Sequence, residues 1–290
     1  MNILKKIFAH AALILLAIAC VILFLMVVAV SFSGEADLAR YGYSLIPKSP
    51  QLTAYRYVFS NATQLFNAYK ITIFVSIAGT VGGMLVMIGL AYPLSREDFI
   101  FKKQLSTFLF ITMIFSGGLV PSYIWISKYL QLRDTIWVLI VPMLVNVWNV
   151  FLLRTFFKTV PKSLIESAML DGAGEFYILM KIIIPLSKVG IATISLFTLL
   201  AYWNDWFTSM IYIDNKNLVS LQYLMYRIME NVSFFKSSSQ SVQAMLGTQG
   251  IPNETVRMAI CVIAAGPMIF VFPFFQKYFA KGIMVGSIKG

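Results

Sequence analysis

Residues 11–30 read AALILLAIACVILFLMVVAV, and this uncharged apolar run decides the class of fold. A helix of about 20 residues, rising about 1.5 Å per residue, crosses the roughly 30 Å of hydrocarbon in a bilayer. Lys5 and Lys6 precede the run, as in a secretory signal peptide. The apolar stretch continues to Phe32, well past the roughly 7–15 apolar residues of a signal peptide. We therefore interpret residues 8–32 as a retained membrane span.

The composition extends this interpretation to the whole chain of 290 residues. It is 59% hydrophobic and 12% charged, whereas soluble domains are about 45–50% apolar and about 25% charged. These proportions exclude an ordinary soluble enzyme, a disordered chain and a disulfide scaffold, and the continuous runs exclude an outer-membrane barrel. Hydropathy predicts an all-α polytopic membrane protein with six transmembrane helices in a single transmembrane domain, residues 1–290. The predicted spans cover about residues 8–32, 70–94, 105–127, 135–157, 186–211 and 257–279.

The distribution of positive charge orients the predicted spans. The net charge is +11, and the Lys and Arg residues flank the apolar runs, so membrane topology explains the charge and no nucleic-acid partner is expected. Lys and Arg are denser, and less balanced by acidic residues, in one set of connecting segments than in the other. The richer set is predicted to be cytoplasmic, which places both termini inside. It comprises residues 1–7, 95–104, 154–188 and 277–290.

The sequence lacks the residues of an enzyme or of an ion-driven carrier. It has no Gly-x4-Gly-Lys-Ser/Thr phosphate loop, and its single histidine, His10, has no cysteine or carboxylate cluster around it. No catalytic residue, metal ligand or cofactor is therefore expected in this chain. A proton- or sodium-driven carrier keeps ionisable residues within its spans, and Asp205 is the only acid in a predicted span. A secondary carrier and a non-transporting membrane scaffold are the alternatives to the function developed below.

The most informative segment lies between the predicted fourth and fifth spans, at residues 161–185. Ser163 and Glu166 have the spacing of a capping box, which predicts that a helix starts there. Gly172 is suited to end this helix with a left-handed residue. Glu175 suits the positive end of a second helix. The pattern thus predicts two short helices at an angle, joined by a turn.

Pro185 follows the second short helix and opens the predicted fifth span. The first short helix carries too many apolar residues for a purely solvated loop, which indicates that it meets another surface. The alternative is a capped connector that packs only on its own bundle. The apolar residues in question are Leu164, Ile165, Ala168 and Met169.

This segment resembles the EAA signature, Glu-Ala-Ala-x3-Gly-x9-Ile-x-Leu-Pro, of the membrane permeases of binding-protein-dependent ABC importers. Ser167 replaces an alanine of the signature and Ile184 replaces a leucine, and both are similar in size to the residue replaced. Asp171-Gly172-Ala173 is similar to the Asp-Gly-Ala of the sugar-importing members. The resemblance implies a pair of cytoplasmic coupling helices that contact an ATPase. The residues that it assigns to this coupling are Glu166, Ser167, Ala168, Asp171, Gly172, Ala173 and Pro185.

Three further stretches resemble the carbohydrate branch of these permeases, which includes the maltose G-type and LplC-like members. They are Ser116-Gly-Gly-Leu-Val-Pro-Ser-Tyr123, Tyr202-Trp-Asn-Asp-Trp-Phe207 and the chain end from Gln276 to Gly290. Together with the EAA-like segment they cover most of the chain. The resemblance therefore implies a permease subunit that forms half of the translocation pathway for a sugar or oligosaccharide.

The same resemblance implies the partners of the chain. A second homologous permease subunit would complete the pathway, and two copies of a separate ABC ATPase would hold ATP and Mg at the cytoplasmic face. An extracytoplasmic sugar-binding protein would deliver the substrate. The complex would lie in the cytoplasmic (inner) membrane of a bacterium or archaeon. The absent phosphate loop fits this division of labour.

The sequence also indicates where a sugar could pass. Gly117-Gly118 interrupts the predicted third span, and broken helices are tolerated where they line a cavity; the alternative is a simple kink. The stretch around Asn204 mixes aromatic rings with hydrogen-bonding groups, which suits the C–H faces and hydroxyls of sugars. The alternative there is an aromatic belt at the membrane interface. The predicted pathway residues are Ser116, Tyr123, Tyr202, Trp203, Asn204 and Asp205.

Overall fold

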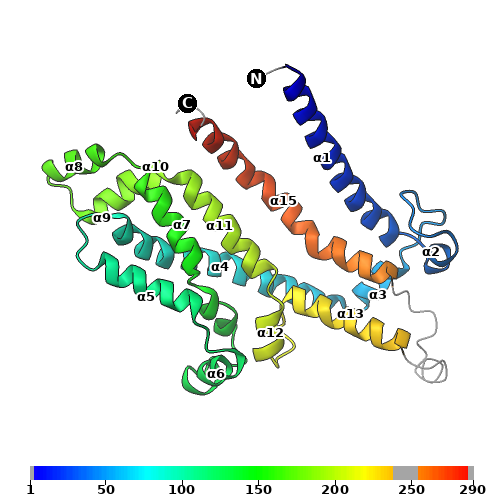
Figure 1. Cartoon of the computed structure of the whole chain (residues 1–290). Helices are drawn as coiled ribbons and strands as arrows, with labels where there is room; N and C mark the ends of the chain where they lie inside the picture. The colour runs from blue at the N-terminus through cyan, green and yellow to red at the C-terminus, as the bar shows by residue number, and fades with distance from the viewer. Residues whose placement is uncertain (1–2, 238–253, 287–290) are drawn as a thin grey trace. The chain divides into compact units, whose positions relative to one another are not determined.

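The computed structural model describes residues 3–237 and 254–286, which are helical apart from turns and one isolated bridge between Ser33 and Pro50 (Figure 1). Three helices within these residues are long and apolar enough to cross a membrane: α1 (Ile3–Ser31), α4 (Ala62–Ser95) and α15 (Glu254–Gly286). Three bent helix pairs raise the number of candidate spans to as many as six. The prediction of an all-helical polytopic membrane protein is therefore confirmed.

The predicted third, fourth and fifth spans, 105–127, 135–157 and 186–211, are not straight helices. The third is α5 (Lys102–Ile114) followed by α6 (Leu119–Ile124) and η2 (Trp125–Tyr129), with a bend of 110°. The fourth is η3 (Ile136–Leu139) and η4 (Val141–Met143) followed by α7 (Val147–Lys158), with a bend of 51°.

The fifth predicted span is broken at both ends. Before it lie α9 (Glu175–Ile178), the π-helix η5 (Leu179–Ile183) and α10 (Ile184–Leu186), and α11 (Lys188–Trp203) then leaves at 83° to them. A second break at residues 204–206 separates α11 from α12 (Phe207–Tyr212). Hydropathy reports apolar length but not these changes of direction, because the residues at the breaks are themselves mostly apolar or small.

The chain divides into two compact units. The first unit comprises Met1–Phe66 and Leu224–Ile269. Besides α1 it contains α2 (Glu35–Tyr41), α3 (Thr53–Val58), η1 (Phe59–Asn61) and most of α13 (Leu221–Ser237). The carboxylate of Glu35 accepts hydrogen bonds from the backbone N–H groups of Glu254 (3.1 Å) and Thr255 (3.2 Å). A carboxylate from a distant segment therefore caps the start of α15, where the free N–H groups and the helix dipole favour negative charge.

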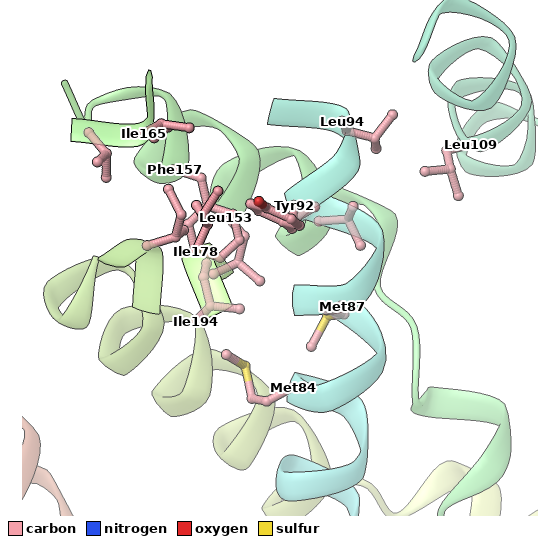
Figure 2. Packing of buried hydrophobic residues seen from close by; sticks show 14 residues of the cluster. Met84, Met87, Tyr92, Leu94, Leu109, Leu153, Phe157, Ile165, Ile178 and Ile194 are labelled. Atoms are coloured by element: carbon pink, nitrogen blue, oxygen red, sulfur yellow. The ribbon is translucent and has the colours of Figure 1, made fainter. Parts of the chain in front are cut away.

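The second unit comprises Asn67–Tyr223 and Phe270–Gly290 and contains the candidate site. Its core gathers buried side chains from α4, α5, α7, α8 (Lys162–Leu170), α9 and α11, and Figure 2 shows Phe157 and Leu153 of α7 at its centre. Gly190 lets α11 approach α7 closely, because a Cβ atom there would lie 2.3 Å from the Phe156 ring. Small residues at such crossings are what membrane helices use to pack tightly.

Candidate functional site

The first short helix of the EAA-like segment is α8. The capping-box prediction for it is wrong, because α8 begins at Lys162 with Pro161 as its N-cap and no side chain caps it. Pro161 has φ −57° and ψ 129°, which places the extended N-cap residue two positions earlier than expected. Ser163 consequently lies inside the first turn. The Glu166 carboxylate is exposed and has no hydrogen-bond or ion-pair partner among the described residues.

Gly172 ends α8 as predicted, with φ +81°. The N–H of Gly172 donates to the carbonyl of Met169 (3.0 Å), and the N–H of Ala173 donates to that of Ala168 (2.9 Å). This pair of bonds is a Schellman motif, in which the residue after the helix must take a left-handed conformation. The turn therefore satisfies the last carbonyls of α8 and fixes the direction in which α9 begins at Glu175.

The two faces of this helix pair have different surroundings. Ile165 of α8 (9% exposed) and Ile178 of α9 (0% exposed) belong to the core of the unit, beside Phe157 (Figure 2). On the other face, Leu170 is 90% exposed and Phe176 is 73% exposed. Of the four apolar residues named from the sequence, Ile165 packs on the bundle, whereas Leu164 and Met169 are exposed. That the open face meets another protein stays a prediction.

A groove of about 640 Å³ runs between α8 and α9 on the open side. Most of the residues assigned to coupling by the signature line it. Those residues are Ser167, Ala168, Asp171, Gly172 and Ala173. Glu166 instead lines a neighbouring hollow of about 370 Å³, together with Lys158 and Lys162. Pro185 lies outside both, in α10, and α11 begins only after the bend that follows it.

The loop that follows α4 holds this segment in place, which sequence reasoning missed. Arg96 pairs with Glu175 at 3.3 Å, and Glu97 pairs with Lys162 at 2.5 Å. The ammonium group of Lys162 lowers the pKa of the Glu97 carboxyl, mainly through their hydrogen bond. The phenol of Tyr92, at the end of α4, donates a hydrogen bond to the Glu175 carboxylate. No spacing in the sequence relates these residues, because they are far apart along the chain.

The predicted pathway residues of the fifth span divide into buried and exposed ones. Tyr202 and Trp203 are each 3% exposed. The Tyr202 hydroxyl donates to the carbonyl of Ile140 (2.8 Å), and its ring lies against Gly79 of α4, where a Cβ atom would come within 2.4 Å. Tyr202 therefore anchors the end of α11 to its neighbours. Asn204 follows at the helix end and is exposed.

Asp205 lies in the break between α11 and α12 and is half-buried. Its carboxylate accepts a hydrogen bond from the N–H of Thr208 (3.1 Å), which caps the first turn of α12. Its backbone carbonyl accepts from the Ser220 hydroxyl (3.2 Å). Asp205 also lines a small cavity of about 10 Å³ with Thr72.

The break in the third predicted span occurs at Gly117-Gly118, as expected, and Gly118 has φ +84°. Ser116 is exposed there, and its hydroxyl accepts a hydrogen bond from the Gly118 N–H (3.3 Å). Tyr123 of α6 stacks on Tyr212 of α12, with ring centroids 5.6 Å apart. The two predicted pathway stretches therefore both contact α12. Asp205 caps its first turn, and Tyr123 stacks on Tyr212 at its last residue.

Within residues 3–237 and 254–286, no group of three His, Cys, Asp or Glu side chains could hold a metal ion. The chemistry of the second unit is instead that of a helix pair with one open face and of a cluster of aromatic and hydrogen-bonding groups at a helix break. Both arrangements are suited to binding another molecule and to a change of conformation.

Comparison with known proteins identifies the family. No family model matches the chain. The chain is 37% identical to the polygalacturonan/rhamnogalacturonan transport system permease protein YtcP of Bacillus subtilis, over 97% of this chain and 96% of the relative. It is 36% identical to Protein LplC of the same organism, over 92% and 88%. The chain belongs to the carbohydrate-uptake permeases of ABC importers.

A solved structure agrees with this family assignment. The permease matches a chain in the crystal structure of a bacterial ABC transporter involved in the import of the acidic polysaccharide alginate. The TM-score is 0.77 at 26% identity, and the match covers 96% of the permease and 99% of that chain. The permease is thus a transport subunit of a binding-protein-dependent sugar importer, a multi-pass protein of the cytoplasmic membrane without a cofactor of its own. In such importers ATP is hydrolysed on a separate ATPase subunit.

Proposed function

We propose that the 161–185 segment of the permease docks on the ATPase subunit and carries its motion to the helices of the second unit. The observation that carries this proposal is the contrast between the two faces of the α8–α9 pair. Ile165 and Ile178 are fixed in the core, whereas Leu170 and Phe176 are exposed. Their neighbours in sequence, Asp171 and Tyr177, line the groove. Burial of a Leu or Phe side chain contributes about 1.5–3 kcal/mol. The open face therefore suits a cleft on another protein, and the fixed face suits the transmission of force.

The proposed complex follows from this docking. The segment lies in the cytoplasm, with both chain termini on the same side, and residues 1–290 form one transmembrane domain with six spans. A second homologous permease completes the pathway, two copies of the ATPase bind the two coupling segments, and an extracytoplasmic binding protein delivers the sugar. The positive-inside distribution of Lys and Arg supports this orientation.

Glu166 is proposed to contact a cationic group of the ATPase, because its carboxylate is exposed and serves no cap. Glu166→Gln should leave α8 and the complex folded but weaken ATPase attachment about tenfold or more, as expected for the loss of a charge-assisted hydrogen bond. Titrating purified ATPase onto reconstituted permease measures the effect. Ser163→Ala is the matched control and should change nothing, because Ser163 does not cap the helix. Unchanged affinity in Glu166→Gln would remove Glu166 from the interface.

The proposed pathway lies around the break at residues 204–206 and the facing residues of α6. Asn204 and Asp205 supply hydrogen-bonding groups to the sugar, and Tyr123 and Ser116 border the outer part of the path. Tyr202 and Trp203, which are buried, hold the break in position. Two of the relatives described above belong to systems for acidic saccharides. Uronic-acid oligosaccharides and neutral ones are therefore both needed in a transport assay.

Two substitutions at Asp205 separate its proposed transport role from its structural one. Asp205→Asn keeps an oxygen that can accept from Thr208 but removes the charge, whereas Asp205→Ala also removes the cap, at a cost of about 1 kcal/mol. We expect Asp205→Asn to assemble normally and to lower sugar uptake about tenfold or more, in the range of a lost hydrogen bond to a charged group. Uptake kinetics in vesicles measure this. Normal uptake by Asp205→Asn together with poor assembly of Asp205→Ala would leave Asp205 only a cap.

A further inference from the structure

Residues 96–98, in the loop that directly follows α4, contact both helices of the coupling segment. Glu97 pairs with Lys162 at the start of α8, and Arg96 lies 3.7 Å from the sulfur of Met169 near its end. Arg96 also pairs with Glu175 at the start of α9 (3.3 Å). We call these contacts the loop clasp. The loop clasp thus attaches the end of α4 to α8 and α9, on either side of the Gly172 turn.

Arg96 is the centre of the loop clasp. Its side chain is only 12% exposed, so its ion pairs are less screened by water than those of a fully exposed pair. It contacts Asp98 at 3.0 Å as well as Glu175. Tyr92, one turn earlier on α4, donates a hydrogen bond to the same Glu175 carboxylate. Two residues four positions apart, Tyr92 at the end of α4 and Arg96 in the loop after it, therefore contact one acidic residue of the coupling segment.

The same helix reaches the proposed pathway. Gly79 of α4 lies against the ring of Tyr202, at the end of α11. Further along, the Thr72 hydroxyl accepts a hydrogen bond from the N–H of Leu221 (2.7 Å), next to Ser220, which binds the Asp205 carbonyl. Between these contacts and Tyr92, α4 is a continuous helix, and Pro93, which removes one backbone hydrogen bond, lies in its last turn just before Arg96. A displacement of one end of a continuous helix is transmitted to its other end.

The direct route from α9 to α11 is not a straight rod. It passes through the π-helix η5 and then through the 83° bend at Ser187. Helix breaks and π-helical turns are where a helix bends, and such points absorb motion between the elements that they join. Of the two connections between the coupling segment and residues 202–205, the one along α4 is a single helix from Tyr92 to Gly79, whereas the other is bent by 83°.

We propose that α4 is a second mechanical link between the coupling segment and the pathway, and that Arg96 and Glu175 are positioning residues that fasten it. This inference rests on the proposed docking of the 161–185 segment on the ATPase. It adds that movement of the coupling segment is transmitted along two helices, α4 and α11. The Arg96–Glu175 ion pair determines how much of this movement reaches α4.

Charge reversal of the pair in the full complex tests the link. All variants are made in an Asp98→Asn background, which serves as the reference, because Asp98 lies 3.0 Å from Arg96 and would repel a carboxylate there. Arg96→Glu and Glu175→Arg each place like charges together, and the double variant restores an opposite pair in reversed order. In reconstituted complexes we expect both single variants to retain the ATPase, since the open face of α8–α9 is untouched. Sugar-stimulated ATP hydrolysis should fall about fivefold or more, the lower range of a typical coupling between sites. The double variant should recover most of the stimulation and of the sugar moved per ATP.

Arg133→Asp is the matched control, because it reverses the charge of an ion pair with Asp214 that does not involve the coupling segment. It should hydrolyse ATP as the reference complex does. The inference is overturned if either single reversal keeps normal stimulation, if the double variant recovers nothing, or if the single variants lose the ATPase. The docking proposal fails on a different result, namely ATPase binding that is insensitive to changes on the open face of α8–α9, so the two failures are distinguishable.

Discussion

Gly172→Val should abolish sugar-stimulated ATP hydrolysis while leaving the permease inserted in the membrane. Gly172 has φ +81° and occupies the left-handed position of the Schellman motif that ends α8. A left-handed conformation costs an ordinary L-residue about 1–2 kcal/mol, and a β-branched residue is a genuine outlier there. The chain should therefore adopt another turn, which misdirects Leu170 on one side and Phe176 on the other. ATPase attachment should weaken, and stimulation should be lost.

Gly174→Ala is the matched control for this substitution. Gly174 lies two residues further on with φ −74° and has nothing within 4 Å of an added Cβ, so alanine fits without strain. Both variants are purified as complexes, and retained ATPase and sugar-stimulated hydrolysis are measured side by side. If Gly172→Val binds the ATPase and is stimulated like Gly174→Ala, the turn has no part in coupling.

Gly79→Ala should destabilise the second unit and greatly reduce the yield of active complex. A Cβ atom at this position would lie 2.4 Å from the ring of Tyr202, whose hydroxyl is tied to the Ile140 carbonyl. Either α4 moves away from α11 or the Tyr202 hydrogen bond breaks, and overpacking of this kind costs about 1–3 kcal/mol. The thermal unfolding midpoint of the detergent-purified complex should fall, and sugar uptake should fall with it.

Gly89→Ala provides the comparison on the same helix. A Cβ atom at Gly89 meets nothing within 4 Å, and alanine is the better helix former by about 1 kcal/mol. Its unfolding midpoint should therefore stay level or rise. Equal midpoints for the two alanine variants would show that Gly79 and Tyr202 are not in close contact in the folded permease.

The sequence predicted those features that depend on local chemistry. Hydropathy located the long apolar helices, and the left-handed Gly172 followed from the preference of helix ends for glycine. Gly117-Gly118 marked the break in the third predicted span, since paired glycines weaken a helix. The family followed from the EAA-like segment, because its residues lie close together along the chain.

The predictions that failed or were missed concern one helix start and several tertiary contacts. Ser163 and Glu166 have capping-box spacing, but Pro161 starts the helix earlier and leaves both without that role. The aromatic character of Tyr202 and Trp203 suggested a surface for sugar, whereas both are buried, Tyr202 against Gly79 of α4. The contact of Arg96 with Glu175 joins the loop after α4 to the first residue of α9. Only the fold brings them together, so no sequence spacing could reveal the pair.

Site-specific photocrosslinking tests the central claim most directly. A photoreactive amino acid is placed at Leu170, which is 90% exposed on the open face of α8, and in a separate variant at Ile46, which is 78% exposed in the first unit. The proposed docking and orientation predict a crosslink from position 170 to the ATPase subunit, lost when the complex is dissociated before illumination, and none from position 46. A crosslink to the ATPase from position 46, with none from position 170, would contradict both the docking and the orientation.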